Sequence, residues 1–97
     1  MTESFFVRAI QIAKATIGLN IHGPRRRNGE AYYNPCQNHY TASSPREYSV
    51  LDWMRNRGYM EKENCSYRLT QKGFLWLSSI LSIDIWYYEE PEVGFYD

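Results

Sequence analysis

Three consecutive arginines, Arg25 to Arg27, form the densest positive charge in this 97-residue chain. Three tyrosines follow them, at Tyr32, Tyr33 and Tyr40. A guanidinium can contact a phosphate and an aromatic ring can stack on a base, so the combination suits nucleic-acid binding. The same groups suit an acidic protein surface, and a solvated loop is the third interpretation. We expect at least two of the tyrosines to pack on the core.

The sequence contains no motif for catalysis. It has no glycine-rich phosphate loop, no pair of metal ligands spaced along a helix and no nucleophile motif, so we predict neither an enzyme nor a cofactor. Cys36, Cys65, His22 and His39 are the residue types of a zinc site, and the gap from Cys36 to His39 is typical of metal ligands. Because Cys65 has no partner close in sequence, we interpret both cysteines as reduced structural thiols and predict no metal site.

A helix that could position binding residues is predicted from Pro45 to Arg57. Ser44 is placed as its N-cap, and Glu47 can reach back to the backbone N–H of that cap, which makes a capping box. Gly58 follows as a left-handed C-cap. The sequence therefore marks both ends of this helix.

The helical repeat gives this helix two faces. With Val50, Leu51 and Met54 inward, the outward positions at about 100° per residue are Tyr48, Ser49, Asp52 and Asn56. Asp52 would meet a phosphate unfavourably. The remaining outward residues could read base edges, flanked by cations toward the DNA backbone; these residues are Tyr48, Ser49 and Asn56, with Arg46, Arg55 and Arg57.

Two short extended segments follow, at residues 59–63 and 66–70, with a polar tip at Asn64 and Cys65 that could close a hairpin. Lys62 and Arg68 are its cations, and two glutamates offset them. A further helix begins after the cap Thr70, and its buried face is predicted to contain Phe74, Leu77 and Leu81 with Leu75.

This order of elements resembles the C-terminal half of a winged helix-turn-helix domain. The resemblance covers residues 43–81 and is carried by Gly-Tyr-Met at 58–60 and Tyr-Arg-Leu-Thr-Gln-Lys-Gly at 67–73. It implies that Pro45 to Arg57 is the recognition helix and that residues 59–70 are the wing. The implied fold class is α+β, a small winged helix-turn-helix-like domain with a two-stranded wing and a C-terminal extended arm.

The N-terminal part contains one clear helix, predicted over residues 2–17 and ended by Gly18. Its apolar stripe consists of Phe6, Ala9, Ile10, Ala13 and Ile17. Residues 19–42 contain two glycines and two prolines that break helices, so no second full helix is predicted there. We expect a long ordered loop, or at most a short helix that starts at Asn34-Pro35 and runs through Tyr40.

Charge is unevenly distributed although the chain is neutral overall. Residues 1–83 carry all 11 Lys and Arg and six acids, whereas residues 84–97 carry five acids and no base. Alternation from Ile83 to Tyr88 predicts an extended segment. We therefore divide the chain into a winged-helix-like domain, residues 1–83, and an acidic aromatic arm, residues 84–97. The candidate partner-binding residues are Tyr32, Tyr33, Trp86, Tyr87, Tyr88 and Phe95.

Two functions are compatible with these features. The first is a small DNA-binding transcriptional regulator on double-stranded DNA, with phosphate contacts from Arg25, Arg26, Arg27, Arg46, Arg55, Arg57, Lys62 and Arg68. The second is a phage-type inhibitor, such as an antirepressor or anti-CRISPR-like protein, that uses the scaffold to bind a protein partner. The sequence favours the first narrowly. A homodimer is compatible with either.

No apolar run reaches the roughly 20 residues that span a bilayer, and the N-terminus lacks the features of a signal peptide. We therefore expect a cytoplasmic protein without a membrane partner.

Overall fold

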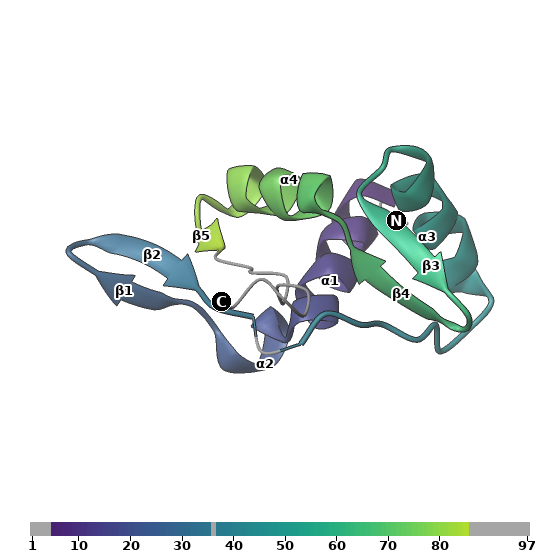
Figure 1. The fold of residues 1–97 in the computed structure, drawn as a ribbon, viewed down its shortest axis with the longest axis horizontal. Helices are drawn as coiled ribbons and strands as arrows, with labels where there is room; N and C mark the ends of the chain where they lie inside the picture. Colours follow the sequence, from purple (N-terminus) through teal and green to yellow (C-terminus); the bar gives the residue numbers. More distant parts are fainter. Residues whose placement is uncertain (1–4, 36, 86–97) are drawn as a thin grey trace, which may run out of the picture.

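Helix α1 (Phe5–Ile17) lies at the centre of the molecule, between the other helices and the strand β4 (Figure 1). The computed structural model describes residues 5–35 and 37–85. In this part of the chain four helices and two small sheets form an α+β domain. After α1 the elements are α2 (Leu19–His22), β1 (Arg25–Arg27), β2 (Glu30–Tyr33), α3 (Arg46–Asn56), β3 (Met60–Glu63), β4 (Ser66–Leu69), α4 (Gln71–Leu81) and β5 (Asp84–Ile85).

The buried stripe of α1 is rotated from the predicted one. Ala9, Ala13 and Ile17 are buried as expected, but the stripe is completed by Ile12 and Thr16. Thr16 is tolerated in the core because its hydroxyl donates a hydrogen bond to the carbonyl of Ile12, at 2.7 Å. The prediction that Phe6 and Ile10 belong to this stripe was wrong in part, since Phe6 is 46% exposed and Ile10 is half-buried.

Helix α3 has the inward face that its spacing predicts. Val50, Leu51 and Met54 are all buried, where α3 packs on α1 and β3. Gly58 follows with φ of 81°, and the N–H of Tyr59 donates to the carbonyl of Met54 at 2.9 Å. This bond satisfies a carbonyl at the end of α3, so the predicted glycine C-cap is confirmed.

The start of α3 differs from the predicted capping box. Pro45 precedes the first helical residue, and the hydroxyl of Ser44 does not act as the N-cap. The carboxylate of Glu47 reaches back one residue further, to accept from the N–H of Ser43 at 2.8 Å and from the hydroxyl of Tyr40 at 2.8 Å. The reason is that Tyr40 forms a β-bridge with Tyr67, which holds the preceding segment against the first turn of α3.

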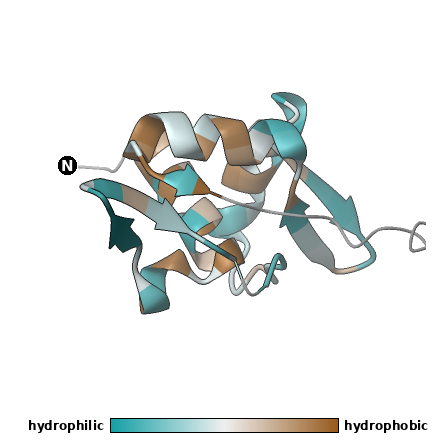
Figure 2. Cartoon of the chain, turned by 60° about the vertical axis from the view of Figure 1, so that its left-hand side comes forward, coloured by the Kyte–Doolittle hydropathy of each residue, from teal (hydrophilic) through white to brown (hydrophobic). Residues whose placement is uncertain are grey.

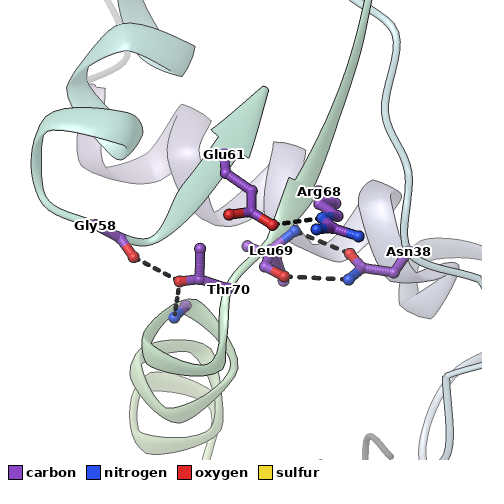
Figure 3. A network of polar contacts seen from close by, with 7 residues as sticks. Asn38, Gly58, Glu61, Arg68, Leu69 and Thr70 are labelled. Atoms are coloured by element: carbon purple, nitrogen blue, oxygen red, sulfur yellow. Dashed lines mark hydrogen bonds and ion pairs between the residues drawn. The ribbon is translucent and has the colours of Figure 1, made fainter. Parts of the chain in front are cut away.

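The predicted hairpin and the following helix are both present. β3 and β4 pair antiparallel from Met60 opposite Leu69 to Glu63 opposite Ser66. The hydroxyl of Thr70 accepts from the N–H of Gly73 at 3.1 Å and donates to the carbonyl of Gly58, so it caps α4 and ties it to the end of α3 (Figure 3). These contacts join the hairpin to both neighbouring helices.

The buried face of α4 consists of Gly73, Phe74 and Leu77. Leu75, which was predicted to be buried with them, is 63% exposed, so that prediction was wrong. Gly73 has a specific role, because a Cβ at this position would lie 2.1 Å from the carbonyl oxygen of Tyr59. A residue with a side chain could not let α4 approach the backbone of Tyr59 so closely.

Residues 25–33 form an antiparallel hairpin, so the expectation of a loop there was wrong. Arg25 faces Tyr32 and Arg27 faces Glu30 across β1 and β2. The two turn residues, Asn28 and Gly29, have φ of 54° and 81°. Positive φ at both positions is the type I′ geometry that Asn-Gly favours, so the signal was present in the sequence.

The alternative of a short helix from Asn34-Pro35 through Tyr40 was also wrong for the described residues. Residues 37–40 instead run beside β4, where the amide of Asn38 donates to the carbonyl of Leu69 at 3.1 Å and accepts from its N–H at 2.9 Å (Figure 3).

Strand β5 pairs in parallel with β2 and completes a three-stranded sheet of order β1-β2-β5. An extended start to the C-terminal arm is therefore confirmed for Asp84 and Ile85. The remainder of the arm, residues 86–97, lies outside the described residues.

Candidate nucleic-acid interface

The three consecutive arginines occupy β1, and all are exposed. Because side chains alternate along a strand, Arg25 and Arg27 lie on one face of the hairpin and Arg26 lies on the other. The β1–β2 hairpin extends from the body at one end of the long axis of the molecule (Figure 1). The guanidinium groups are thus presented on an arm with two accessible faces.

A hollow lies beside each face of this arm. One, of about 430 Å³, is lined by His22, Gly23, Arg25, Tyr32, Tyr33 and Asn34. The other, of about 730 Å³, includes Arg26 and the segment from Leu81 to Asp84. Each hollow therefore has an arginine on its wall.

The three tyrosines Tyr32, Tyr33 and Tyr40 differ in their burial and packing. Tyr33 is 4% exposed, and its hydroxyl donates to the carbonyl of Ile17 at 2.8 Å. The prediction that Tyr33 binds a partner is therefore corrected, since it is a core residue. Tyr40 also packs against the core, while Tyr32 is half-buried on β2. Two of the three tyrosines thus pack on the core, as expected.

The outward face of α3 agrees with the helical wheel. Tyr48, Ser49, Asp52 and Asn56 are all exposed. A groove of about 510 Å³ separates α3 from the β3–β4 hairpin, and it is lined by Asp52, Arg55, Asn56, Met60, Glu61 and Lys62. Three of the predicted nucleic-acid residues, Arg55, Asn56 and Lys62, are thereby brought together.

The cations around this groove have neighbours of opposite charge or aromatic character. Nη1 of Arg55 lies 3.7 Å from Oδ1 of Asp52. Nζ of Lys62 lies 5.7 Å from the centre of the Tyr67 ring. On the outer face of the hairpin, Arg68 forms an ion pair with Glu61 (Figure 3). Exposed pairs of this kind are worth only about 0–1 kcal/mol, but they reduce the positive field that a phosphate would meet.

Arg46 and Arg57 lie away from the groove. Their spacing places them on one flank of α3 with Trp53, and the guanidinium of Arg57 lies 4.7 Å from the centre of the Trp53 ring. The predicted nucleic-acid residues are therefore divided among the β1–β2 arm, the groove, the outer face of the β3–β4 hairpin and this flank. The arm and α3 lie at opposite ends of the molecule (Figure 1).

The surplus positive charge is concentrated in the N-terminal part. Residues 5–35 carry five bases and one acid, Glu30, whereas residues 37–85 carry six bases and five acids. Strand β1, with three arginines and no acid, is therefore the most cationic element, and α3 with the β3–β4 hairpin is nearly balanced.

Sequence reasoning missed the polar contacts that hold the segment before α3. Burial raises the pKa of Tyr40 to about 12, and its hydrogen bond to the Glu47 carboxylate acts in the same direction. Asn38 was also missed, although it contacts β4 through both atoms of its amide. No local sequence pattern predicts either contact. Asn38 and its partner Leu69 lie far apart in the chain, and the bond between Tyr40 and Glu47 is not part of a capping box.

The remaining predicted residues add little to this site. Trp86, Tyr87, Tyr88 and Phe95 lie outside the described residues, as does Cys36. Cys65 is exposed at the tip of the β3–β4 hairpin. Within residues 5–35 and 37–85, three or more His, Cys, Asp or Glu side chains do not come together as a metal site.

Comparisons with known protein families, with curated proteins and with solved structures found no match. The described helices include none with the length and apolar composition needed to cross a membrane.

Proposed function

We propose that this protein binds double-stranded DNA as a small winged-helix-like transcriptional regulator. The observation that carries the proposal is the β1–β2 arm, which presents Arg25, Arg26 and Arg27 to solvent in the part of the chain where bases outnumber acids five to one. Arginine is suited to phosphate because its planar donors match the phosphate oxygens. The arm is the main phosphate-binding element in this proposal.

The order of α3, the β3–β4 hairpin and α4 supports the winged-helix assignment. In this proposal α3 is the recognition helix, and it presents Tyr48, Ser49 and Asn56 to base edges. The β3–β4 hairpin is the wing. The β1–β2 arm lies between α2 and α3 in the chain.

The pairing of charges argues for the arm rather than the groove as the source of affinity. Asp52 lines the groove and would repel a phosphate, and Arg55 is already paired with it. The groove is therefore assigned to base contacts and the arm to phosphate contacts.

The test is binding to a random-sequence DNA duplex while salt is varied. Each phosphate contact contributes about −0.9 to the slope of log affinity against log salt, so about five contacts give a slope near −4 to −5. Replacing all three arginines of the arm with Ala should flatten the slope by about 2 to 3. The matched control is the triple Arg→Lys variant, which keeps the charge and should keep most of the slope.

Absence of duplex binding by the parent protein at low salt would contradict the DNA proposal. An unchanged slope in the triple Ala variant would contradict the assignment of the arm, provided that its thermal unfolding matches that of the parent.

A second candidate is a phage-type inhibitor that uses the same scaffold to bind a protein. The observation that favours it is the near-neutral surface of α3 and the β3–β4 hairpin, where Arg55 and Arg68 are paired with carboxylates. A protein partner can bind such a balanced surface, whereas binding of a polyanion such as DNA relies on surplus positive charge.

A further inference from the structure

Four aromatic rings contact one another in series on the surface of the molecule. Phe6 of α1 meets Trp76 of α4 edge to face at 6.3 Å, and Trp76 stacks on Tyr59 at 4.5 Å with an angle of 12° between their planes. Tyr59 then meets Trp53 of α3 at 6.3 Å. Phe6 is exposed and the other three rings are half-buried. We call these four residues the aromatic ladder.

Two cations lie on the aromatic ladder. The guanidinium of Arg57 is 4.7 Å from the centre of the Trp53 ring, and Nζ of Lys72 is 5.8 Å from the centre of the Tyr59 ring. α1 and α4, which supply its other two rings, contain no Asp or Glu. The two carboxylates of α3 are engaged elsewhere, Glu47 by Ser43 and Tyr40, and Asp52 by Arg55. This surface is therefore cationic and without a matching carboxylate on its three helices.

Apolar side chains extend the aromatic ladder at the Phe6–Trp76 end. Phe5, next to Phe6, is 48% exposed, and Leu75, next to Trp76, is 63% exposed. Figure 2 shows apolar residues recurring along α4, whereas β1 and the β3–β4 hairpin are coloured as hydrophilic. Large exposed apolar side chains on the same helices as the rings add to the apolar surface, and such surface marks interaction sites in soluble proteins.

We propose that the aromatic ladder, with Phe5 and Leu75, docks an acidic segment of a partner protein that carries apolar side chains. Carboxylates of the segment pair with Arg57 and Lys72, and its apolar side chains cover Leu75 and the exposed ring of Phe6. Tyr, Trp and Arg are the residue types that contribute most binding energy at protein interfaces. The proposal does not depend on DNA binding, because it uses none of the residues of the β1–β2 arm.

The geometry of the rings favours a protein segment over a single-stranded nucleic acid. Base stacking needs a free ring face. Tyr59 and Trp76 already cover one another, and Arg57 and Lys72 lie over Trp53 and Tyr59. A symmetric contact with a second copy is disfavoured because it would bring the same cations of both copies together.

The probe is a short fluorescein-labelled peptide that is rich in Glu and carries Leu and Trp, and binding is measured by fluorescence polarisation. The parent should bind it saturably. Affinity should fall by about tenfold or more when Glu is replaced by Gln in the peptide, or when its Leu and Trp are replaced by Ser. Equal binding of all three peptides, or no saturable binding of the first, would overturn the proposal.

Variants of exposed positions locate the surface without endangering the fold. Leu75→Ser should weaken binding, and Arg57→Glu with Lys72→Glu should reverse the preference, so that a Lys-rich version of the peptide binds better than the Glu-rich one. The control is Asn20→Glu at an exposed position of α2, which supplies no residue of this surface, and it should bind the acidic peptide like the parent. An equal loss in the control would mean that general charge, not this surface, drives binding.

Three further measurements separate this surface from its alternatives. Arg26→Glu on the β1–β2 arm should weaken duplex binding but leave peptide binding intact, while Leu75→Ser should do the reverse, so either proposal can fail alone. Deleting residues 89–97 should leave peptide affinity unchanged; a tenfold rise would assign the surface to the protein's own acidic tail instead. Leu75-dependent binding to phosphatidylserine vesicles, with none to the peptide, would assign it to a membrane surface.

Discussion

Glu47 joins the segment before α3 to the helix itself. Its carboxylate accepts hydrogen bonds from the N–H and hydroxyl of Ser43, at 2.8 and 3.2 Å, and from the hydroxyl of Tyr40. Through Tyr40, which bridges to Tyr67 of β4, the start of α3 is connected to the β3–β4 hairpin. One carboxylate therefore holds together two segments that flank the groove.

Glu47→Ala should destabilise the protein by about 1–3 kcal/mol, because hydrogen bonds to a charged group are worth that much. Ser44→Ala is the matched control one turn away, and it should change the free energy of unfolding by less than about 0.5 kcal/mol. Urea denaturation measures both. An equal cost for the two variants would mean that Ser44 caps the helix after all.

Tyr40 should make stability fall at high pH. Burial, together with the Glu47 carboxylate, raises the pKa of Tyr40 to about 12 in the folded protein, above its usual value near 10. The folded state therefore holds this proton more tightly. The contribution of the Tyr40 phenol to the free energy of unfolding is complete below about pH 10 and is lost as the pH rises through about 12. The difference in unfolding free energy between the parent and Tyr40→Phe should shrink across this range. A constant difference would mean that the phenol ionises normally.

At the scale of elements, the β1–β2 arm depends on its turn. Gly29 has φ of 81°, which costs about 1–2 kcal/mol for a residue with a Cβ. Gly29→Ala should therefore reduce amide protection in residues 25–33 with little change in the thermal midpoint, because the turn lies at the exposed end of the arm. Asn28→Gly is the control, since glycine adopts positive φ freely and should keep the protection.

The Gly29→Ala variant also tests the proposed role of the β1–β2 arm in phosphate binding. If the hairpin geometry positions the three arginines for phosphate, Gly29→Ala should also weaken duplex binding, without removing any charge. Full duplex affinity in a variant whose arm has lost its amide protection would show that the arginines act as an unstructured cationic segment.

At the scale of the whole molecule, the acidic tail, which is the acidic aromatic arm of residues 84–97, is opposite in charge to the domain. Residues 84–97 carry five acids and no base, while the described residues before them carry the surplus of positive charge. Deleting residues 89–97 removes four of these acids, Glu89, Glu90, Glu92 and Asp97. This deletion should raise duplex affinity, most strongly at low salt, where the Debye length is longest.

The control for the deletion is a full-length chain with the same four acids changed to Gln or Asn. It should raise affinity as the deletion does, because the effect is electrostatic. A deletion that raises affinity while the neutralised chain does not would mean that the tail blocks binding by its bulk. Unchanged affinity in both would show that the tail does not compete with DNA.

Local signals in the sequence were sufficient to identify α3, the β3–β4 hairpin and α4 as elements. Gly58 ends α3, Thr70 caps α4, and the spacing of Val50, Leu51 and Met54 identifies the inward face of α3. Each of these signals acts within about one helical turn, so it does not depend on what packs against the element. The Asn28-Gly29 turn was a signal of the same kind that the sequence interpretation overlooked.

Tertiary contacts decided the features that no local signal specifies. Thr16 is buried while Leu75 is exposed, because burial depends on which neighbour covers each face of a helix rather than on hydrophobicity alone. Glu47 bonds to Ser43 and Tyr40 because a bridge to a distant strand places them there. The aromatic ladder joins rings from α1, α3 and α4 with Tyr59, which are separated by long stretches of sequence. Only the packing of these elements against one another brings such residues together.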